Sequence, residues 1–99
     1  MNESEITKQM VARLKSRGAW ARKIHGSMYT AGLPDIIACY KGWCLGLEVK
    51  KPGREKTLTG IQAKTLEHIE EAGGYGRMVT TVEQVDEILD DMLDRKSVV

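Results

Sequence analysis

The chain has 99 residues, of which 41% are hydrophobic and 29% are charged, and its net charge is +1. This composition excludes a collagen-like or disordered chain, and the length suits a single domain over residues 1–99. No apolar run approaches the roughly 20 residues of a membrane span, and the first residues do not form a signal peptide. The two cysteines provide neither a disulfide framework nor a four-ligand zinc site, so we expect a reducing compartment such as the cytoplasm.

The small net charge hides an uneven distribution along the chain. Residues 1–56 carry 11 Lys and Arg against 5 Asp and Glu, a net of +6, whereas residues 57–99 carry 4 against 9, a net of −5. The first half could contact a polyanion, while the second half would repel one. Two differently solvated surfaces explain the same asymmetry equally well.

The first third of the chain predicts a helix, a short strand and a loop. Apolar residues recur at helical spacing from Ser4 to about Arg17, and Gly18 ends the run. Residues 20–25 predict a short strand, and residues 27–34, which include glycine and proline, predict a loop.

Two apolar runs follow and predict a β-hairpin. They cover residues 35–40 and 43–50, and the dipeptide Lys41-Gly42 between them is typical of a tight hairpin turn. Pro52-Gly53 ends the second strand and opens a basic loop. Because both strands are apolar on both faces, we expect helices to cover the sheet on both sides.

The last part of the chain predicts a helix, a strand and a second helix. Thr59 and Gln62 match a T-x-x-Q capping box, which opens a helix that continues to about Ala72. Residues 77–80 predict a strand, and apolar spacing over residues 82–92 predicts a final amphipathic helix. The element order α-β-β-β-α-β-α therefore predicts an α/β fold of the α+β type, with a mixed sheet.

The register of the predicted hairpin places two acids opposite each other. If the turn has two residues, Asp35 lies directly opposite Glu48, and Lys50 projects from the same face as Glu48. Two facing carboxylates are destabilising unless a positive charge lies between them. A divalent cation serves this purpose better than a lysine alone, and Mg²⁺ uses such carboxylate pairs.

A third acid, Glu3, comes from the first predicted helix. The apolar stripe of Ile6, Met10 and Leu14 includes Glu3, whereas Glu5 falls on nearly the opposite side of the helix. We therefore expect Glu3 to point toward the sheet. An acid placed in the first turn because of the helix dipole would look the same.

The same register makes Cys39 and Cys44 cross-strand neighbours. Two thiols without two further ligands do not make a zinc site. We expect both cysteines to be small core residues.

These residues carry a resemblance to a known family. The segments GLPD (residues 32–35) and LEVK (residues 47–50) resemble the PD…(D/E)xK signature of restriction-endonuclease-like nucleases. Glu3 in the opening helix, the basic exit KKPG (residues 50–53) and LTGIQ (residues 58–62) extend the likeness to the VRR-NUC (virus-type replication-repair nuclease) family. Its small standalone phage and bacterial members are the most similar, and the resemblance covers residues 3 to about 94.

The resemblance implies a fold, a location and a site. The fold would be an αβββαβ core with an additional C-terminal helix, in the cytoplasm of a bacterial or phage-infected cell. The residues implied to bind Mg²⁺ or Mn²⁺ are Asp35, Glu48, the Val49 carbonyl and, for waters of the metal or a second ion, Glu3. Lys50 would orient or help to deprotonate the attacking water, and Gln62 would belong to the site, although the capping box alone also explains it. The candidates for contacts with DNA phosphates are Lys51, Arg54 and Lys56.

The function that these residues predict is a Mg²⁺- or Mn²⁺-dependent DNA endonuclease. The resemblance implies a homodimer that acts on branched DNA such as Holliday (four-way) junctions, which need two symmetric cuts. One alternative is a less selective endonuclease or nickase of phage replication or packaging. Another is a catalytically inactive DNA-binding module, although carboxylates at the site would repel phosphates without serving a pure binding surface.

A third alternative is an interaction protein whose acidic final helix binds a partner. We expect the acids of that helix to form a solvated face instead: Glu83, Asp86, Glu87, Asp90, Asp91 and Asp94.

Overall fold

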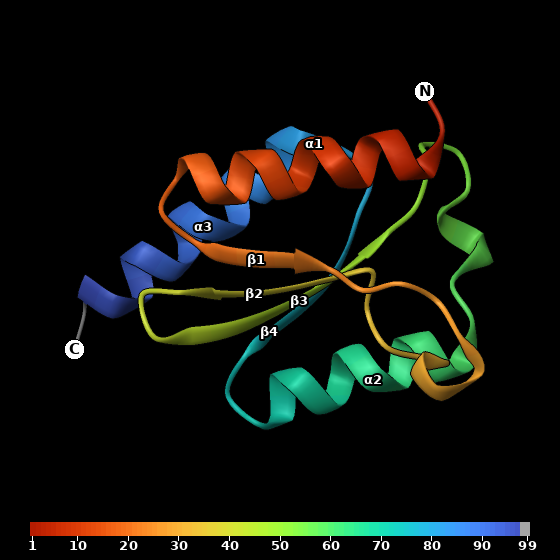
Figure 1. Ribbon diagram of the computed structural model, residues 1–99. Coiled ribbons are helices and arrows are strands. Elements are labelled where there is room, and N and C mark those ends of the chain that lie inside the picture. Colours follow the sequence, from red (N-terminus) through yellow and green to blue (C-terminus); the bar gives the residue numbers. More distant parts are fainter. Residues whose placement is uncertain (98–99) are drawn as a thin grey trace.

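A computed structural model of the chain describes residues 1–97 and shows a mixed β-sheet with helices on both faces (Figure 1). The strands lie side by side in the order β1 (Trp20–Lys23), β2 (Ile36–Tyr40), β3 (Trp43–Val49) and β4 (Tyr75–Val79). β2 is antiparallel to both β1 and β3, whereas β4 is parallel to β3. The predicted element order and the mixed sheet are confirmed.

The helices are divided between the two faces of the sheet. α1 (Glu3–Ser16) and α3 (Val82–Ser97) cover one face, and α2 (Gly60–Glu71) covers the other (Figure 1). The core between α1, α3 and the sheet is formed by apolar side chains such as Ile6, Met10, Leu14, Ile36, Leu45, Leu47, Val79, Val85 and Leu89. Among residues 1–97, no helix combines the length and the apolar composition that crossing a membrane requires.

Two short 3₁₀ helices and several strand boundaries differ from the sequence prediction. η1 (Met28–Thr30) lies in the predicted loop after β1, and η2 (Glu55–Thr57) lies in the basic loop after β3. β1 ends at Lys23 rather than at residue 25, and β4 begins at Tyr75 rather than at residue 77 because Tyr75 already pairs with Leu45.

The β2–β3 hairpin has the predicted two-residue turn and register. Lys41 (φ 54°) and Gly42 (φ 88°) both adopt positive φ, as a type I′ turn requires, and Tyr40 pairs with Trp43.

The next pair along the β2–β3 hairpin is Cys39 and Cys44, and both cysteines are exposed. The prediction that they are core residues is wrong, because α2 does not extend over this part of the sheet.

The absence of a side chain at Gly76 allows α2 to lie directly against β4. A Cβ atom at Gly76 would lie 2.3 Å from the carbonyl oxygen of Leu66 in α2. Gly46 in the neighbouring strand also lies under α2, since a Cβ there would lie 2.6 Å from Cδ1 at the end of the Ile69 side chain. The two glycines pair with each other in the sheet, so they form one contact area for the helix.

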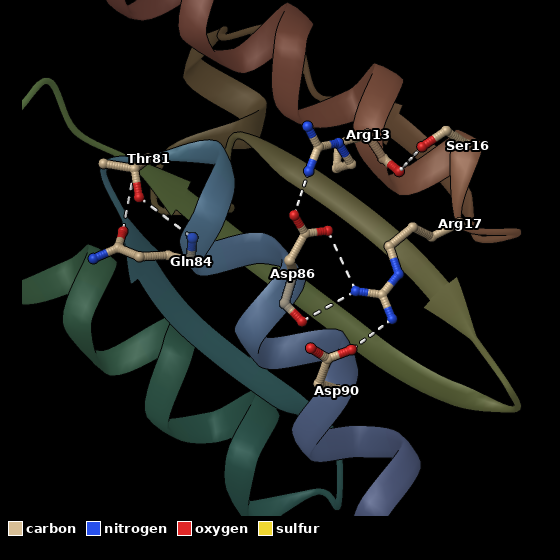
Figure 2. A network of polar contacts seen from close by, with 7 residues as sticks. All are labelled: Arg13, Ser16, Arg17, Thr81, Gln84, Asp86 and Asp90. Carbon is tan, nitrogen blue, oxygen red and sulfur yellow. Dashed lines mark hydrogen bonds and ion pairs between the residues drawn. The ribbon is translucent and has the colours of Figure 1, made fainter.

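Ion pairs between α1 and α3 hold together the two helices on the other face (Figure 2). Arg13 pairs with Asp86, and Arg17 contacts Asp86 at 3.3 Å and Asp90 at 2.7 Å. The hydrogen bond to Asp90 raises the pKa of Arg17 above its ordinary value, so Arg17 stays positively charged. The prediction that the acids of the last helix form a solvated face is therefore wrong for Asp86, which is half-buried between the two arginines, but Asp90 is exposed as predicted.

Candidate active site

Asp35 and Glu48 meet at the open end of the β2–β3 hairpin. Asp35 directly precedes β2, and continuing the observed register places it opposite Glu48. The Ile24 N–H donates to the Asp35 carbonyl oxygen at 2.8 Å, and the Val49 N–H donates to Asp35 Oδ2 at 2.8 Å. Asp35 Oδ2 thus accepts a main-chain N–H just beyond the last residue pair of the β2–β3 ladder, Ile36 and Leu47. Main-chain groups thereby fix the Asp35 carboxylate.

Glu48 is a buried acid with one unsatisfied oxygen. It is only 3% exposed, and Gln62 Nε2 donates to its Oε1 at 3.0 Å. Within the described part of the chain, Glu48 Oε2 has no hydrogen-bond partner while both acids are ionised. Burial of this kind costs free energy unless a proton or a cation compensates for it.

The environment of Glu48 raises its pKa from 4.5 to about 8. Burial is the largest cause, followed by the negative charge of Asp35 and by the hydrogen bond that a protonated Glu48 shares with Asp35. The positive charge of Lys50 acts in the opposite direction, and the charge of Glu3 adds slightly to the rise. Near neutral pH and without a cation, the acid pair therefore retains a proton.

Lys50 follows β3 and lies in the same buried surroundings as Glu48. It is 8% exposed, and its N–H donates to the Val79 carbonyl oxygen at 2.9 Å, which ties it to β4. Lys50 comes two residues after Glu48, which places both on the same face of the strand, and its positive charge partly offsets the rise that burial causes in the pKa of Glu48. The structure thus brings together Asp35, Glu48, Lys50 and Gln62.

Glu3 lies at the edge of this cluster. Its Oε2 accepts the Lys51 N–H at 3.2 Å, so the side chain reaches from α1 to the end of β3 as the helical spacing predicts. Thr7 Oγ1 donates to the Glu3 carbonyl oxygen at 2.7 Å and supports this first turn. However, residues 1–97 contain no group of three or more His, Cys, Asp or Glu side chains arranged to hold a metal ion. The acid pair, without Glu3, is the unit that the structure assembles.

The donor chemistry of the acid pair fits a divalent cation. Two adjacent carboxylates, one of which has a buried oxygen without a partner, match the oxygen ligands that Mg²⁺ and Mn²⁺ use. A cation between them would replace the retained proton and remove the repulsion that raises the pKa of Glu48. Asp35 and Glu48 could therefore hold such an ion.

Gln62 caps α2 and also contacts Glu48. Its Oε1 accepts the Thr59 N–H at 2.9 Å, and its N–H bonds to Thr59 Oγ1 at 3.2 Å, which completes the capping box of α2. The other side-chain atom, Nε2, donates to Glu48. The start of α2 is thus connected directly to the acid pair.

The three cations predicted to contact DNA are exposed. Lys51, Arg54 and Lys56 lie in the loop that begins directly after Lys50, and a hydrogen bond of 2.9 Å from the Arg54 N–H to the Lys51 carbonyl oxygen gives the loop its turn. The loop therefore presents positive charge beside the acid pair.

The site also uses main-chain donors that residue patterns do not reveal. The N–H groups of Val49 and Lys51 hold Asp35 and Glu3, respectively. Any residue except proline supplies an N–H, so the sequence carries no signal for these contacts.

A separate hollow of about 410 Å³ between α1 and the start of α3 borders Lys51 but contains neither Asp35 nor Glu48.

Comparison with known proteins identifies the fold. No family profile matches the sequence, and no curated protein matches it. A solved structure described as "VRR_NUC domain" does match, with a TM-score of 0.71 and 22% sequence identity, over 89% of this chain and 94% of that chain. Together with the mixed sheet and its flanking helices, this match confirms the predicted architecture. The chain has the restriction-endonuclease-like fold of a VRR-NUC domain.

Proposed function

We propose that the protein is a DNA endonuclease that depends on Mg²⁺ or Mn²⁺. The observation that carries this proposal is the pair of facing acids, Asp35 and Glu48, beside the buried Lys50. A purely structural role does not explain why a buried glutamate keeps an unsatisfied oxygen next to a second acid. The likeness to a VRR_NUC domain supports the same interpretation.

We propose that Asp35, Glu48 and the Val49 carbonyl would hold the cation, with Glu3 at the edge of the site. The bound cation would supply positive charge for the transition state of phosphodiester hydrolysis and lower the pKa of the attacking water. The role of Glu3 is inferred from its contact at the end of β3.

Each side chain of the site has a distinct task in this proposal. Asp35 is fixed by the Val49 N–H, so its free oxygen keeps one direction. Gln62 holds Glu48 Oε1 and leaves Oε2 available. The Lys50 ammonium orients the attacking water and offsets the negative charge that develops on the phosphate.

The exposed loop cations support DNA as the substrate. Lys51, Arg54 and Lys56 would bind phosphates and bring the backbone to the acid pair. We further propose that the active form is a homodimer and that branched DNA such as a four-way junction is preferred. A two-fold dimer would present two sites to a substrate that needs two symmetric cuts.

Cleavage assays with labelled DNA test this proposal. Four-way junction, duplex and single-stranded DNA are incubated with the purified chain in Mg²⁺, Mn²⁺ or EDTA, while light scattering gives the oligomeric state. We expect cleavage only with metal, and fastest for the junction. Glu71→Gln, which changes an exposed acid at the far end of α2, is the matched control for Asp35→Asn.

The outcomes separate the parts of the proposal. Equal rates on junction and duplex would remove the preference for branched DNA but keep the nuclease. DNA binding without cleavage in either metal would indicate a binding module instead. Cleavage in EDTA would contradict metal dependence.

A further inference from the structure

Cys39 and Cys44 form an exposed thiol pair that the proposed function does not use. They lie directly opposite each other on β2 and β3, and neither is in a disulfide. Trp20, the partner of Cys39 on β1, is 55% exposed. Gly74 packs close to Cys44, and its lack of a side chain leaves room there, since a Cβ at Gly74 would lie 3.3 Å from the Cys44 Cβ.

The backbone hydrogen bonds identify which kind of cross-strand pair this is. The Asp35 carbonyl oxygen bonds to Ile24, so the odd-numbered residues of β2 direct their main-chain groups toward β1. The Lys50 N–H bonds to Val79, so the even-numbered residues of β3 direct theirs toward β4. Cys39 is odd and Cys44 is even, which makes them a non-hydrogen-bonded pair.

A non-hydrogen-bonded pair brings two cysteines within range of each other. Its Cα atoms are about 4.5 Å apart, and disulfides occur at Cα separations of about 4.4–6.8 Å. Both side chains project from the same face, because directly paired residues of neighbouring strands share a face.

We propose that Cys39 and Cys44 are a redox modification site that closes reversibly to a cross-strand disulfide with low-molecular-weight disulfides. One thiolate attacks the small disulfide RSSR, forms a mixed disulfide and releases one RSH. The second thiolate then attacks the protein sulfur of the mixed disulfide and releases the second RSH. Two protein thiols are oxidised, one RSSR is reduced to two RSH, and no other reactant is needed.

The geometry favours a reversible bond over a permanent one. Non-hydrogen-bonded pairs lie at the short end of the range of about 4.5–5.5 Å for paired Cβ atoms, where it meets the roughly 3.5–4.5 Å of a disulfide. Because both cysteines are exposed, a small thiol can reach and reduce the bond. The pair lies near the turn, while Asp35 and Glu48 lie at the opposite end of the same two strands, so this site is independent of the proposed nuclease.

Equilibration in glutathione redox mixtures tests the proposal. The full chain is incubated with mixtures of reduced and oxidised glutathione, the remaining thiols are alkylated, and the intact mass is measured. We expect the loss of two hydrogen atoms and of both free thiols, in a fraction that rises with the ratio of oxidised to reduced glutathione. The product should run as a single chain on a non-reducing gel, and dithiothreitol should restore both thiols.

Single-cysteine variants provide the matched controls. Cys39→Ser and Cys44→Ser change exposed side chains and should stop at one glutathione adduct, because no second thiol can resolve the mixed disulfide. A parent chain that accumulates two adducts, or that forms disulfide-linked dimers, would overturn the proposal. So would a bond that stays closed at every glutathione ratio, since the site would then be a permanent crosslink.

Discussion

Glu48 is the residue at which stability and the proposed chemistry oppose each other. A buried carboxylate without a full set of partners is costly, and a neutral residue would suit the fold better. Gln62 satisfies one oxygen, and the Val49 N–H holds the neighbouring Asp35, but while both acids are ionised nothing in the described chain satisfies Glu48 Oε2. A local conflict of this kind is expected at functional sites, where the fold tolerates what the chemistry requires.

The raised pKa of Glu48 predicts a pH-dependent stability in the absence of metal. Since the pKa is about 8 in the folded chain and 4.5 ordinarily, the folded state holds more protons between these values. The stabilisation is full below pH 4.5 and is lost as the pH rises toward 8, by up to about 1.4 kcal/mol per pH unit. Urea unfolding of the parent in EDTA, at several pH values from 5 to 9, measures this loss.

Glu48→Gln is the control for this measurement. The variant keeps an oxygen for the Gln62 contact and cannot ionise, so its stability curve lacks the contribution of Glu48. The difference between variant and parent should therefore grow from pH 5 to 8 in favour of the variant. Parallel curves over this range would show that Glu48 titrates at an ordinary pKa.

Asp35→Asn should separate folding from the proposed metal binding. Asparagine still offers an oxygen to the Val49 N–H, and one charge of a repelling pair is removed. We expect the metal-free variant to be as stable as the parent or more so, to lose most of the rise in Tm that Mg²⁺ or Mn²⁺ gives the parent, and to cleave DNA about a thousandfold or more slowly. Thermal melts with and without metal, run beside a cleavage assay, measure all three effects.

Two results would contradict this expectation in different ways. If Asp35→Asn unfolds the metal-free chain, the side chain is chiefly an anchor for the end of the ladder. If the variant folds and cuts DNA at the parent rate, the nuclease proposal is wrong.

At the scale of elements, the β2–β3 hairpin was the most predictable part of the molecule. Lys41-Gly42 is a short-range signal that specifies both the turn and the register, and the register in turn predicted that Asp35 and Glu48 lie opposite each other. The capping box at Thr59 was equally local, and the same T-x-x-Q pattern at Thr81 and Gln84 makes the reciprocal hydrogen bonds that begin α3. Local signals predict local structure well.

The features that sequence reasoning missed depend on how distant elements pack. The extent of α2 over the sheet leaves Cys39 and Cys44 exposed, and the approach of α3 to α1 pairs Asp86 with Arg17. Neither outcome has a signal within a short window of sequence, because each depends on packing between elements far apart in the chain. The part of the site that lies between elements, such as the Gln62 contact with Glu48, was supported only by resemblance.

Gly76→Ala should test how strongly the position of α2 depends on the glycine contact. The new Cβ would meet main-chain atoms of Leu66, which cannot move without shifting the helix. We expect a loss of about 3 kcal/mol in the free energy of unfolding. Gly60→Ala is the matched control, since nothing lies within 4 Å of a Cβ there and alanine should stabilise the helix by about 0.5 kcal/mol. Equal stability of the two variants would mean that α2 is not held by this close approach.

At the scale of the whole molecule, folding partly neutralises the charge asymmetry of the sequence. Arg13 and Arg17 from the basic first half pair with Asp86 and Asp90 from the acidic second half, on the face of α1 and α3 (Figure 2). The cations of the loop after β3 lie beside the acid pair instead, at the end of the sheet where Glu3 accepts the Lys51 N–H. The positive charge available to DNA is therefore more local than the sequence composition indicates.

This distribution predicts that DNA binding depends on where charge is removed and not only on how much. Replacing Lys51, Arg54 and Lys56 together by glutamine should weaken binding to every DNA sequence. It should also reduce the slope of log K against log salt by up to about 3, because each phosphate contact contributes about 0.9. Binding is measured by fluorescence anisotropy in Ca²⁺ over a range of salt concentrations.

The matched control replaces three exposed lysines of α1 and α2, Lys8, Lys15 and Lys64, by glutamine and produces the same net charge. Because long-range attraction is screened within about 10 Å at 0.1 M salt, the control should bind nearly as the parent does. If both triple variants lose the same affinity and slope, DNA responds only to the total charge and the loop is not its binding surface.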